Sequence, residues 1–366
     1  NMNANEVIAT LANDKLGLGL STKDANGVHP NDHVNMGQSS NDTFPSAMHI
    51  AGALELKAMT AALDKLHAAL DAKAKQWDTV MKTGRTHLMD ATPIRLGQVF
   101  AGYAAQAHYG VTRAGRALKR LEENMPIGGT AVGTGINTHP NFAERVCETL
   151  ERRTGIAFQE GDDHAEAQAA KDSFVEAHGE LKTIAVSLSK IANDIRHLGS
   201  GPRCGIGELN LPAIQPGSSI MPGKVNPVIC ESVMQVACRV LGNDATVTTA
   251  GLGGVGSIFE LNVAMPVMID AFLESVDLLT NVSNVFVDKL LDALEVNEVR
   301  CTELLEASLM TITALAPEIG YDQCSALAKQ AHKEGKTIKE LVGEMNLMAA
   351  ERLEELMDYE AMTRPG

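Results

Sequence analysis

Residues 181–195 read Leu-Lys-Thr-Ile-Ala-Val-Ser-Leu-Ser-Lys-Ile-Ala-Asn-Asp-Ile. The large aliphatic side chains in this stretch recur at alternating spacings of three and four, at Leu181, Ile184, Leu188, Ile191 and Ile195. That heptad-like spacing places them on one face of an α-helix, where they can pack against other helices. We predict that this seam belongs to a helix that runs from about residue 164 to residue 198.

Four other stretches of the chain carry a similar apolar seam. In one of them Met59, Leu63, Leu66 and Leu70 recur at spacings of four and three. We expect long helices over about residues 45–76, 93–124 and 266–291, and a further one from about residue 227 onward. Helices of this length are well above the mean of roughly 11–12 residues in globular proteins. No strand pattern stands out, so the sequence predicts an all-α fold, a long five-helix bundle.

The helical segments shorten after residue 292, which suggests a change of domain. We expect short helices over about residues 297–315, 321–333, 336–343 and 349–357. The first 38 residues hold only short helical pieces and polar loops. We therefore predict a central bundle domain over residues 39–292 and a small C-terminal helical domain over residues 293–366. Pro45 is expected in the first turn of its helix, and Gly128 to Gly135 as a flexible connection.

Composition excludes several classes of protein. The 366 residues carry a formal net charge of −15 and no basic stripe, which argues against a nucleic-acid partner. An acidic chain must meet an anionic substrate with a few placed cations. The six cysteines lack C-x-x-C spacing, which is typical of reduced thiols in a cytosol rather than of disulfides or a zinc site. No apolar run reaches about 18 residues, so we predict no membrane-spanning segment.

One loop combines the groups that catalysis needs: Gly217-Ser-Ser-Ile-Met-Pro-Gly-Lys-Val-Asn-Pro227. It holds two hydroxyls, one ammonium and one carboxamide, and its glycines and prolines specify a fixed backbone path. These features indicate an anion pocket with a nucleophile or base. The alternative is a Gly/Ser connector between helices, but such linkers are repetitive and polar, whereas this loop carries Ile220, Met221 and Val225.

Two nucleotide-binding motifs are matched only superficially. Residues 251–256 fit G-x-G-x-x-G, but a helix is predicted before them where a dinucleotide site needs a strand. The 217–227 loop resembles a phosphate-binding P-loop, yet its spacing is one residue too long. Val225 also stands where a Ser or Thr would hold Mg²⁺. We reject both interpretations.

Two further loops are rich in short hydrogen-bonding side chains: Ser39-Ser40-Asn41 and Thr86-His87. Each has a structural alternative, a helix cap for the first and a structural histidine for the second. Lys224 can be plain surface charge, and Glu231 can serve only the helix dipole. Together, however, the loops supply amides and hydroxyls for carboxylates, a histidine for proton transfer, and donors for a developing negative charge.

The three loops resemble the signature regions of the fumarase/aspartase superfamily. The similar segments are Gln38 to Pro45, Gly84 to His87, and Gly217 to Pro227, and the likeness extends through nearly the whole chain. Within that superfamily the sequence is most similar to class II fumarases. His87 follows Thr86 where aspartases carry Gln; Ser40, Phe44 and Gly223 stand where aspartases tend to have Thr, Tyr and Ala; and Phe259 to Val263 is also fumarase-like.

The resemblance implies a lyase, a fumarate hydratase of the tricarboxylic acid cycle. It would convert fumarate reversibly to (S)-malate by anti addition of water through an aci-carboxylate carbanion, without a metal or organic cofactor. By similarity, Ser218 is the base at carbon, and Lys224 and Asn226 hold the carboxylate that takes the charge. His87, polarised by Glu231, handles the proton of water.

The resemblance also implies how substrate is bound and how the protein assembles. The expected substrate-binding residues are Asn3, Ser39, Ser40, Asn41, Thr86 and Ser219. His29, Asn31 and Asp32 match a second dicarboxylate site near the surface. The family forms a homotetramer around a twenty-helix core, in which each active site draws on three subunits. A cytoplasmic location is expected, with a mitochondrial one also open.

The chain departs from the family at its start. It opens inside the family's G-S-G-T-x-x-N-M-N segment, retaining Asn3 but not the preceding Ser and Thr. On this likeness residues 1–38 are a remnant of the N-terminal domain, and we expect this chain alone to have weak activity or none. The rival functions are aspartate ammonia-lyase or another lyase of the superfamily, and a non-catalytic scaffold. The intact Ser218, His87, Lys224 and Asn226 argue against a scaffold.

Overall fold

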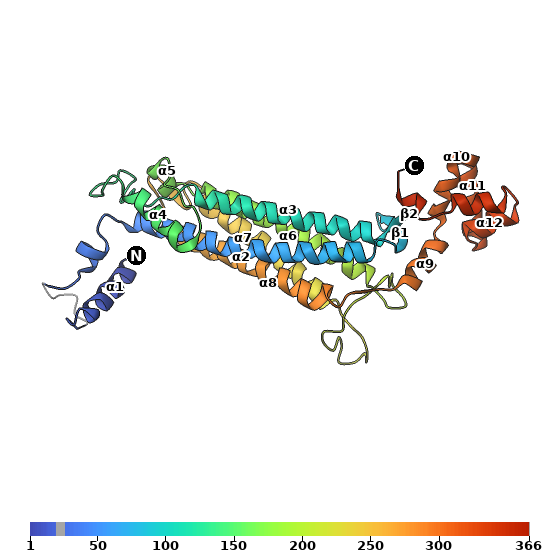
Figure 1. Ribbon diagram of the computed structural model, residues 1–366, viewed down its shortest axis with the longest axis horizontal. Coiled ribbons are helices and arrows are strands. Elements are labelled where there is room, and N and C mark those ends of the chain that lie inside the picture. The colour runs from blue at the N-terminus through green and yellow to red at the C-terminus, as the bar shows by residue number, and fades with distance from the viewer. Residues whose placement is uncertain (20–25, 366) are drawn as a thin grey trace. The chain divides into compact units, whose positions relative to one another are not determined.

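Five long helices dominate the computed structural model, which describes residues 1–19 and 26–365 (Figure 1). They are α2 (Ser40–Gln76), α3 (Leu96–Glu122), α6 (Asp172–Leu198), α7 (Val228–Gly251) and α8 (Met265–Phe286). The prediction of an all-α fold built on five long helices is therefore confirmed. No helix in the described ranges combines the length and apolar character that a membrane-spanning segment needs.

The chain divides into two compact units, and each of the five long helices contributes residues to both. Unit 1 comprises Asn1–Asp64, Tyr109–Leu188 and Met234–Ser283. Unit 2 comprises Lys65–His108, Ser189–Val233 and Asn284–Gly366. The predicted seams form the cores: Leu63, Leu181 and Ile184 are buried in unit 1, and Leu66, Leu70 and Ile191 are buried in unit 2.

Unit 1 also holds α1 (Met2–Lys15), the π-helix η1 (Pro30–Val34), α4 (Phe142–Thr154), α5 (His164–Ala169) and the short strands β4 (Ser257–Ile258) and β5 (Leu261–Asn262). Its core contains an edge-to-face pair, with the rings of Phe174 and Phe272 5.3 Å apart. Buried His178 on α6 joins two other helices. Its Nε2 lies 2.9 Å from Ser275 Oγ, and its Nδ1 lies 3.1 Å from Asp244 Oδ1. These bonds satisfy a polar ring that apolar neighbours surround.

Unit 2 is built around a hairpin, β1 (Met81–Thr86) and β2 (Met89–Arg95), which connects α2 to α3. The rings of Trp77 and Phe100, on the two sides of the hairpin in sequence, lie edge to face at 4.8 Å. A second pairing joins β3 (Leu209–Asn210) to β6 (Glu295–Val296), antiparallel. This pairing fixes the segment that follows α6 against the segment that follows α8.

The C-terminal part of unit 2 consists of short helices. They are α9 (Glu298–Ala307), α10 (Ala316–Ile319), α11 (Tyr321–Glu334), α12 (Ile338–Glu344) and α13 (Ala350–Leu356), with short 3₁₀ and π segments η2 (Val287–Leu291), η3 (Leu309–Leu315) and η4 (Ala361–Thr363). Leu315, Leu327 and Leu341 belong to an apolar cluster made entirely of these helices. Thr337 caps α12 with a reciprocal capping box to Glu340, as the sequence pattern T-x-x-E favours.

Several local expectations were wrong. Helix α2 begins at Ser40, five residues before Pro45, so this proline lies beyond the first turn and leaves one helical carbonyl without its usual N–H donor. The helix expected from residue 164 is interrupted at Ala170, which is extended. Lys171 Nζ donates to the carbonyls of Ala167, Gln168 and Ala170 and thereby satisfies the end of α5.

The region between α3 and α6 differs most from expectation. Gly128 to Gly135 was expected to be flexible, but Met125 to Thr130 are buried and hydrogen-bonded. Helix α4 was not anticipated, and neither were the strands. Each strand in the described ranges belongs to a two-stranded pairing. Such short pairings give no period-2 run long enough to be recognised in a sequence.

Candidate active site

The 217–227 loop in unit 2 forms a closed structure around Ser218. Asn226 Nδ2 donates to the Gly217 carbonyl at 2.9 Å, which ties the two ends of the loop together. A Cβ on Gly217 would lie 2.0 Å from the Lys224 carbonyl oxygen, so only glycine allows this approach. Ser218 Oγ accepts hydrogen bonds from the backbone N–H groups of Ile220 (3.3 Å) and Met221 (3.2 Å). Donors aimed at that oxygen favour its negatively charged form.

The remaining residues of this loop are open to solvent. Ser219 and Lys224 are exposed, and within the described ranges no hydrogen bond or ion pair engages the Lys224 ammonium. Glu231 lies in the first turn of α7 and is half-buried. The loop therefore presents one free cation beside a serine whose oxygen already accepts two N–H donors.

Thr86 and His87 lie at the tip of the β1–β2 hairpin in unit 2. His87 and Leu88 form its two-residue turn, with φ values of 56° and 62°, as in the type I′ turns of tight hairpins. Glycine and asparagine are the usual residues there, so two bulky side chains at positive φ hold backbone strain. Strain of this kind is concentrated at functional sites. His87 is fully exposed, and no described residue hydrogen-bonds its ring.

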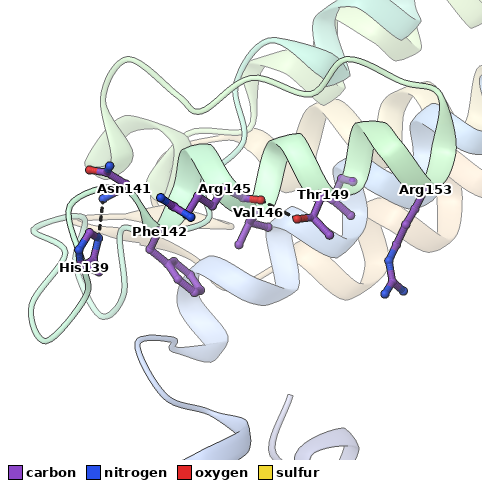
Figure 2. A pocket seen from close by; sticks show the side chains of 8 residues that line it. His139, Asn141, Phe142, Arg145, Val146, Thr149 and Arg153 are labelled. Atoms are coloured by element: carbon purple, nitrogen blue, oxygen red, sulfur yellow. Dashed lines mark hydrogen bonds between the residues drawn. The ribbon is translucent and has the colours of Figure 1, made fainter.

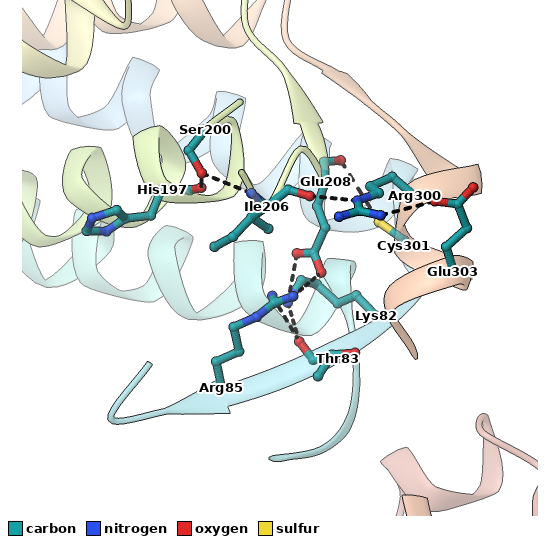
Figure 3. Close-up of polar contacts among 10 residues, drawn as sticks. All are labelled: Lys82, Thr83, Arg85, His197, Ser200, Ile206, Glu208, Arg300, Cys301 and Glu303. Atoms are coloured by element: carbon teal, nitrogen blue, oxygen red, sulfur yellow. Dashed lines mark hydrogen bonds and ion pairs between the residues drawn. The ribbon is translucent and has the colours of Figure 1, made fainter. Parts of the chain in front are cut away.

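A buried ion cluster lies at the base of the same hairpin (Figure 3). Glu208, whose side chain is 0% exposed, pairs with Arg85 at 2.9 Å and with Lys82 at 3.2 Å. Burial lowers the pKa of the Lys82 ammonium, and the Glu208 carboxylate opposes that shift. The strand that ends in Thr86 and His87 is thus attached to the segment that leads to Ser218.

The 39–41 residues lie in unit 1, at the start of α2. Ser39 is the helix cap: its Oγ accepts from Asn41 N at 3.2 Å, and its carbonyl accepts from Thr43. Asn41 Nδ2 donates to the Ala131 carbonyl at 2.8 Å, while Ser40 is exposed. The capping alternative is therefore realised for Ser39, whose hydroxyl takes up the Asn41 N–H, and Ser40 is the exposed polar side chain at this helix start.

Asp42 completes this structure and was not anticipated from the sequence. Its buried carboxylate accepts from the backbone N–H groups of Ser39 (2.9 Å), Gly128 (3.1 Å) and Thr130 (2.9 Å). Burial raises the pKa of the Asp42 carboxyl, and these three donors oppose the rise. Asp42 therefore holds the glycine-containing turn against the start of α2, beside the predicted substrate residues.

The predicted second site lies near the N-terminus of unit 1. His29 caps η1, because its Nδ1 accepts from Asn31 N at 3.3 Å and from Asp32 N at 3.2 Å. The structure thus brings His29, Asn31 and Asp32 together at an exposed turn. Asn3 lies exposed on α1.

Comparison with known proteins agrees with these motifs. The family model described as "Lyase" matches residues 1–242, and the model described as "Fumarase C C-terminus" matches residues 312–364. A class II fumarate hydratase from Methylorubrum extorquens is 50% identical over all of this chain and 76% of its own length. A mitochondrial fumarate hydratase from Rhizopus oryzae is 49% identical over 99% of this chain and 72% of its own length.

The chain belongs to the class II fumarate hydratase family. A crystal structure of the class II fumarase from Schistosoma mansoni matches it with a TM-score of 0.93 at 36% identity. That match covers 100% of this chain and 78% of the other. A fumarate lyase:delta crystallin from Brucella melitensis matches with the same TM-score at 42% identity, over 99% of this chain and 77% of the other.

In this fumarase-family chain one surface cavity lies away from the signature loops, and two others are lined by residues of the Gly84 to His87 segment. Figure 2 shows a cavity of about 690 Å³ in unit 1, lined by His139, Phe142, Arg145 and other residues of α4 and the turn before it. None of the predicted site residues lines this cavity. A cavity of about 540 Å³ in unit 2 is lined by Arg85, Leu88 and Tyr103, among others, and lies beside the hairpin that carries His87.

Two large apolar side chains are exposed in or directly after signature loops of this fumarase-family chain, and a third is exposed in the fumarase-like segment Phe259 to Val263. Leu88 is 79% exposed and Ile220 is 83% exposed in unit 2, and Phe259 is 84% exposed in unit 1. An exposed apolar side chain beside a polar functional loop is typical of a surface that another protein covers. Within the described ranges His87 and Glu231 do not hydrogen-bond one another, so their predicted pairing is not made inside one chain.

Proposed function

We propose that the protein is a fumarate hydratase that adds water reversibly to fumarate and so forms (S)-malate. Membership of the class II family supports this activity, and one observation within the molecule carries the mechanism. Ser218 Oγ accepts two backbone N–H donors in a loop closed by Asn226. A serine needs such donors before it can act as a base, because its alkoxide is otherwise too unstable near neutral pH.

In the direction from malate to fumarate, Ser218 removes a proton from the carbon next to a carboxylate. The electron pair moves into that carboxylate, which becomes an aci-carboxylate with an additional negative charge. Lys224 and Asn226 stabilise this charge, and the absence of a competing partner for Lys224 in the described ranges supports that role. The C–O bond then breaks on the opposite face, and His87 delivers the proton that turns the leaving hydroxide into water. Glu231 polarises His87.

Substrate carboxylates are bound by Asn3, Ser39, Ser40, Asn41, Thr86 and Ser219, and His29, Asn31 and Asp32 form the second dicarboxylate site. The start of α2 supports the first assignment, since its short polar side chains, with Ser40 exposed, suit a carboxylate. The η1 turn supports the second, because it brings His29, Asn31 and Asp32 together at an exposed position.

We further propose that four copies assemble around a twenty-helix core and that each active site draws on three of them. The exposed Leu88 and Ile220, in or next to the loops, and the exposed Phe259 support this assembly. So does the lack of a His87–Glu231 bond within one chain. The proposed domain division at residues 39 and 293 is supported by the separate apolar cluster of the C-terminal helices. We propose a cytoplasmic location, with a mitochondrial one as the alternative, because the similar proteins include bacterial and mitochondrial forms.

Loss of fumarate absorbance in water, measured with protein from the complete reading frame, tests the activity directly. Replacing Ser218 with Ala should lower kcat about 100- to 10,000-fold, because general bases contribute factors of that size. Ser219→Ala is the matched control: it should raise KM and leave kcat largely unchanged, because Ser219 binds substrate only. Near-normal turnover by the Ser218 variant would exclude that residue as the base. Consumption of fumarate that requires ammonia would indicate the aspartase reaction instead.

A further inference from the structure

Glu208 is a buried residue that contacts the hairpin carrying His87 and precedes the segment that leads to the 217–227 loop. Its carboxylate contacts Arg85 Nη2 through Oε1 at 2.9 Å and Lys82 Nζ through Oε2 at 3.2 Å (Figure 3). All of these residues belong to unit 2. Charged groups are rarely buried without a specific partner, so the burial of three charged side chains in this cluster requires an explanation.

On the hairpin side, the contact reaches the residues directly before the catalytic turn. Arg85 immediately precedes Thr86 and His87 on β1. Residues three apart on a regular strand point to opposite faces, yet Lys82 and Arg85 both reach Glu208. The register shift between Thr83 and Arg85 places the extra residue of a β-bulge on β2, where Ala91 and Thr92 face Gly84. The long side chains of Lys82 and Arg85 thus both reach Glu208 from a strand that has no inserted residue.

Gly84 is required at this bulge. A Cβ at Gly84 would lie 2.5 Å from the Thr92 carbonyl oxygen on β2. Arg85 also donates to the Thr83 carbonyl at 3.4 Å, across the bulge. The Glu208 carboxylate therefore sets the orientation of Arg85. Through Arg85 it also sets the direction of the end of β1.

On the other side, the backbone of Glu208 is fixed just before the segment that leads to Ser218. Its N–H donates to the Leu198 carbonyl at 2.9 Å, and its carbonyl accepts from Asn297 N at 2.9 Å. The next two residues form β3, paired with β6. Ala213 to Pro216 are exposed, so within the described ranges β3 is the last paired backbone before the loop.

We propose that Glu208 is a positioning residue for both catalytic loops. Its carboxylate holds the strand that ends in Thr86 and His87, and its backbone fixes the start of the segment that carries Ser218, Lys224 and Asn226. The catalytic role of those loops rests on the proposed function, whereas the physical connection between them does not. In the proposed assembly each active site draws on three copies, so the two loops of one chain need not meet at one substrate. A single rigid residue nevertheless keeps each of these loops in position.

The test replaces Glu208 with Gln, which keeps an acceptor for Arg85 and removes the charge. Misplacement of a catalytic group by about 1 Å costs up to about 100-fold in rate, so kcat should fall about 10- to 100-fold. KM should change less than about 3-fold, because the proposed substrate ligands of unit 1, Ser39, Ser40 and Asn41, are untouched. The pH profile of kcat/KM should also move, since His87 transfers the proton from a displaced position.

Hydrogen exchange measures the connection independently of activity. Backbone amides of residues 81–95 and of residues 209–221 should both exchange about 10-fold faster in the Glu208→Gln variant. Tyr103→Phe is the matched control, because it removes a buried hydrogen bond to Asp194 in the same unit without touching either loop. It should leave both segments, kcat and the pH profile unchanged. If Glu208→Gln fails to fold, Lys82→Met combined with Glu208→Gln removes one charge of each sign and is measured in its place.

Faster exchange in only one segment, or in neither, overturns the proposal. So does a Glu208 variant that melts at a lower temperature but retains wild-type kcat and pH profile, because that result describes a purely structural residue. If the wild-type protein does not hydrate fumarate, the proposed function fails. The exchange measurement then still decides whether Glu208 connects the two loops.

Discussion

Two buried carboxylates, Asp42 in unit 1 and Glu208 in unit 2, each connect segments that are far apart in the sequence. Asp42 accepts from the backbone N–H groups of three residues, two of which lie more than 80 positions away. Glu208 meets two cationic side chains, Lys82 and Arg85. Both carboxylates are fully buried, and each lies next to residues that we assign to the active site.

The difference lies in what their partners can do. Backbone N–H groups do not titrate and cannot rotate away, and each buried one requires a hydrogen-bond acceptor. Cationic side chains can change protonation or adopt another rotamer, and two of them share one carboxylate at Glu208. At Asp42, stability should therefore depend on keeping every hydrogen bond. At Glu208, it should depend on the balance of positive and negative charge.

The largest expected effect on stability is that of Asp42→Asn. A carboxamide has a single acceptor oxygen, and its NH₂ group would face at least one of the three N–H donors. Each buried group left unsatisfied costs about 1–3 kcal/mol, so the free energy of unfolding should fall by roughly 3–5 kcal/mol. Urea unfolding followed by circular dichroism measures this loss.

Asp163→Asn is the matched control for Asp42→Asn. Asp163 caps α5 and accepts from Glu166 N at 3.0 Å, but it is exposed, so water can replace the lost bond. Its cost should stay below about 1 kcal/mol. Equal losses in the two variants would show that the three buried donors do not make Asp42 special.

Acid should weaken unit 1 through a different group, His49. Its Nδ1 donates to the Leu121 carbonyl at 2.8 Å, and burial lowers the pKa of the ring to about 4 from 6.5. The unfolded chain therefore binds more protons between pH 6.5 and 4, and stability is lost as the pH falls through that window. At pH 5 the loss should be about 2 kcal/mol relative to pH 7.

His49→Asn separates this effect from the other titrating groups. The asparagine amide can donate to the Leu121 carbonyl but does not titrate. Melting temperature measured against pH should fall more steeply for the wild type than for the variant between pH 6.5 and 4. Parallel curves would mean that His49 is not the acid-sensitive group of unit 1.

Gly84→Ala tests the close approach of β1 to β2 next to Arg85, the residue that pairs with Glu208. The added Cβ meets the Thr92 carbonyl oxygen at 2.5 Å, so β1 and β2 must separate. Overpacking of this kind typically costs about 1–3 kcal/mol, and here we expect about 1.5. Gly102→Ala, in the same unit on the exposed side of α3, meets nothing within 4 Å and should stabilise by about 0.5–1 kcal/mol. If the two substitutions changed the free energy of unfolding in the same direction, the expected clash at Gly84 would be contradicted.

The sequence predicts the part of this molecule that rests on periodic burial. Leu181, Ile184, Leu188, Ile191 and Ile195 lie in the core because a helix repeats every 3.6 residues, and this repeat is visible in the sequence. The loops around Ser218 and His87 can be recognised in the sequence, because their polar side chains and their family motifs each lie within a few consecutive residues. For these elements, neighbouring residues carry enough information.

What the sequence does not predict depends on partners far along the chain. Asp42 looks like a plain helix-start residue until Gly128 and Thr130 donate to it. Glu208 carries no motif of its own, and a rule based on spacing cannot detect its pairing with Arg85 across 123 positions. A carboxylate between apolar residues, as in Gly207-Glu208-Leu209 before a β-pairing, was the only available signal. The hairpin was missed because its strands, Met-Lys-Thr-Gly-Arg-Thr and Met-Asp-Ala-Thr-Pro-Ile-Arg, show no regular apolar/polar alternation and its turn contains neither Asn nor Gly.

The smallest expected effect is that of Lys82→Met, and it is the most direct test of the charge balance at Glu208. The cluster holds two cations and one carboxylate, and the buried Lys82 ammonium already has a lowered pKa. Removing Lys82 leaves the Arg85–Glu208 pair balanced and replaces a desolvated charge with an apolar chain of similar length. Replacements of that kind are often neutral or stabilising, so the free energy of unfolding should change by less than about 1 kcal/mol. The corresponding loss of the carboxylate leaves two buried cations unpaired and should be far more damaging. A Lys82→Met variant that unfolds as easily as Glu208→Gln would show that the connection depends on each hydrogen bond, as at Asp42, and would remove the distinction between the two carboxylates.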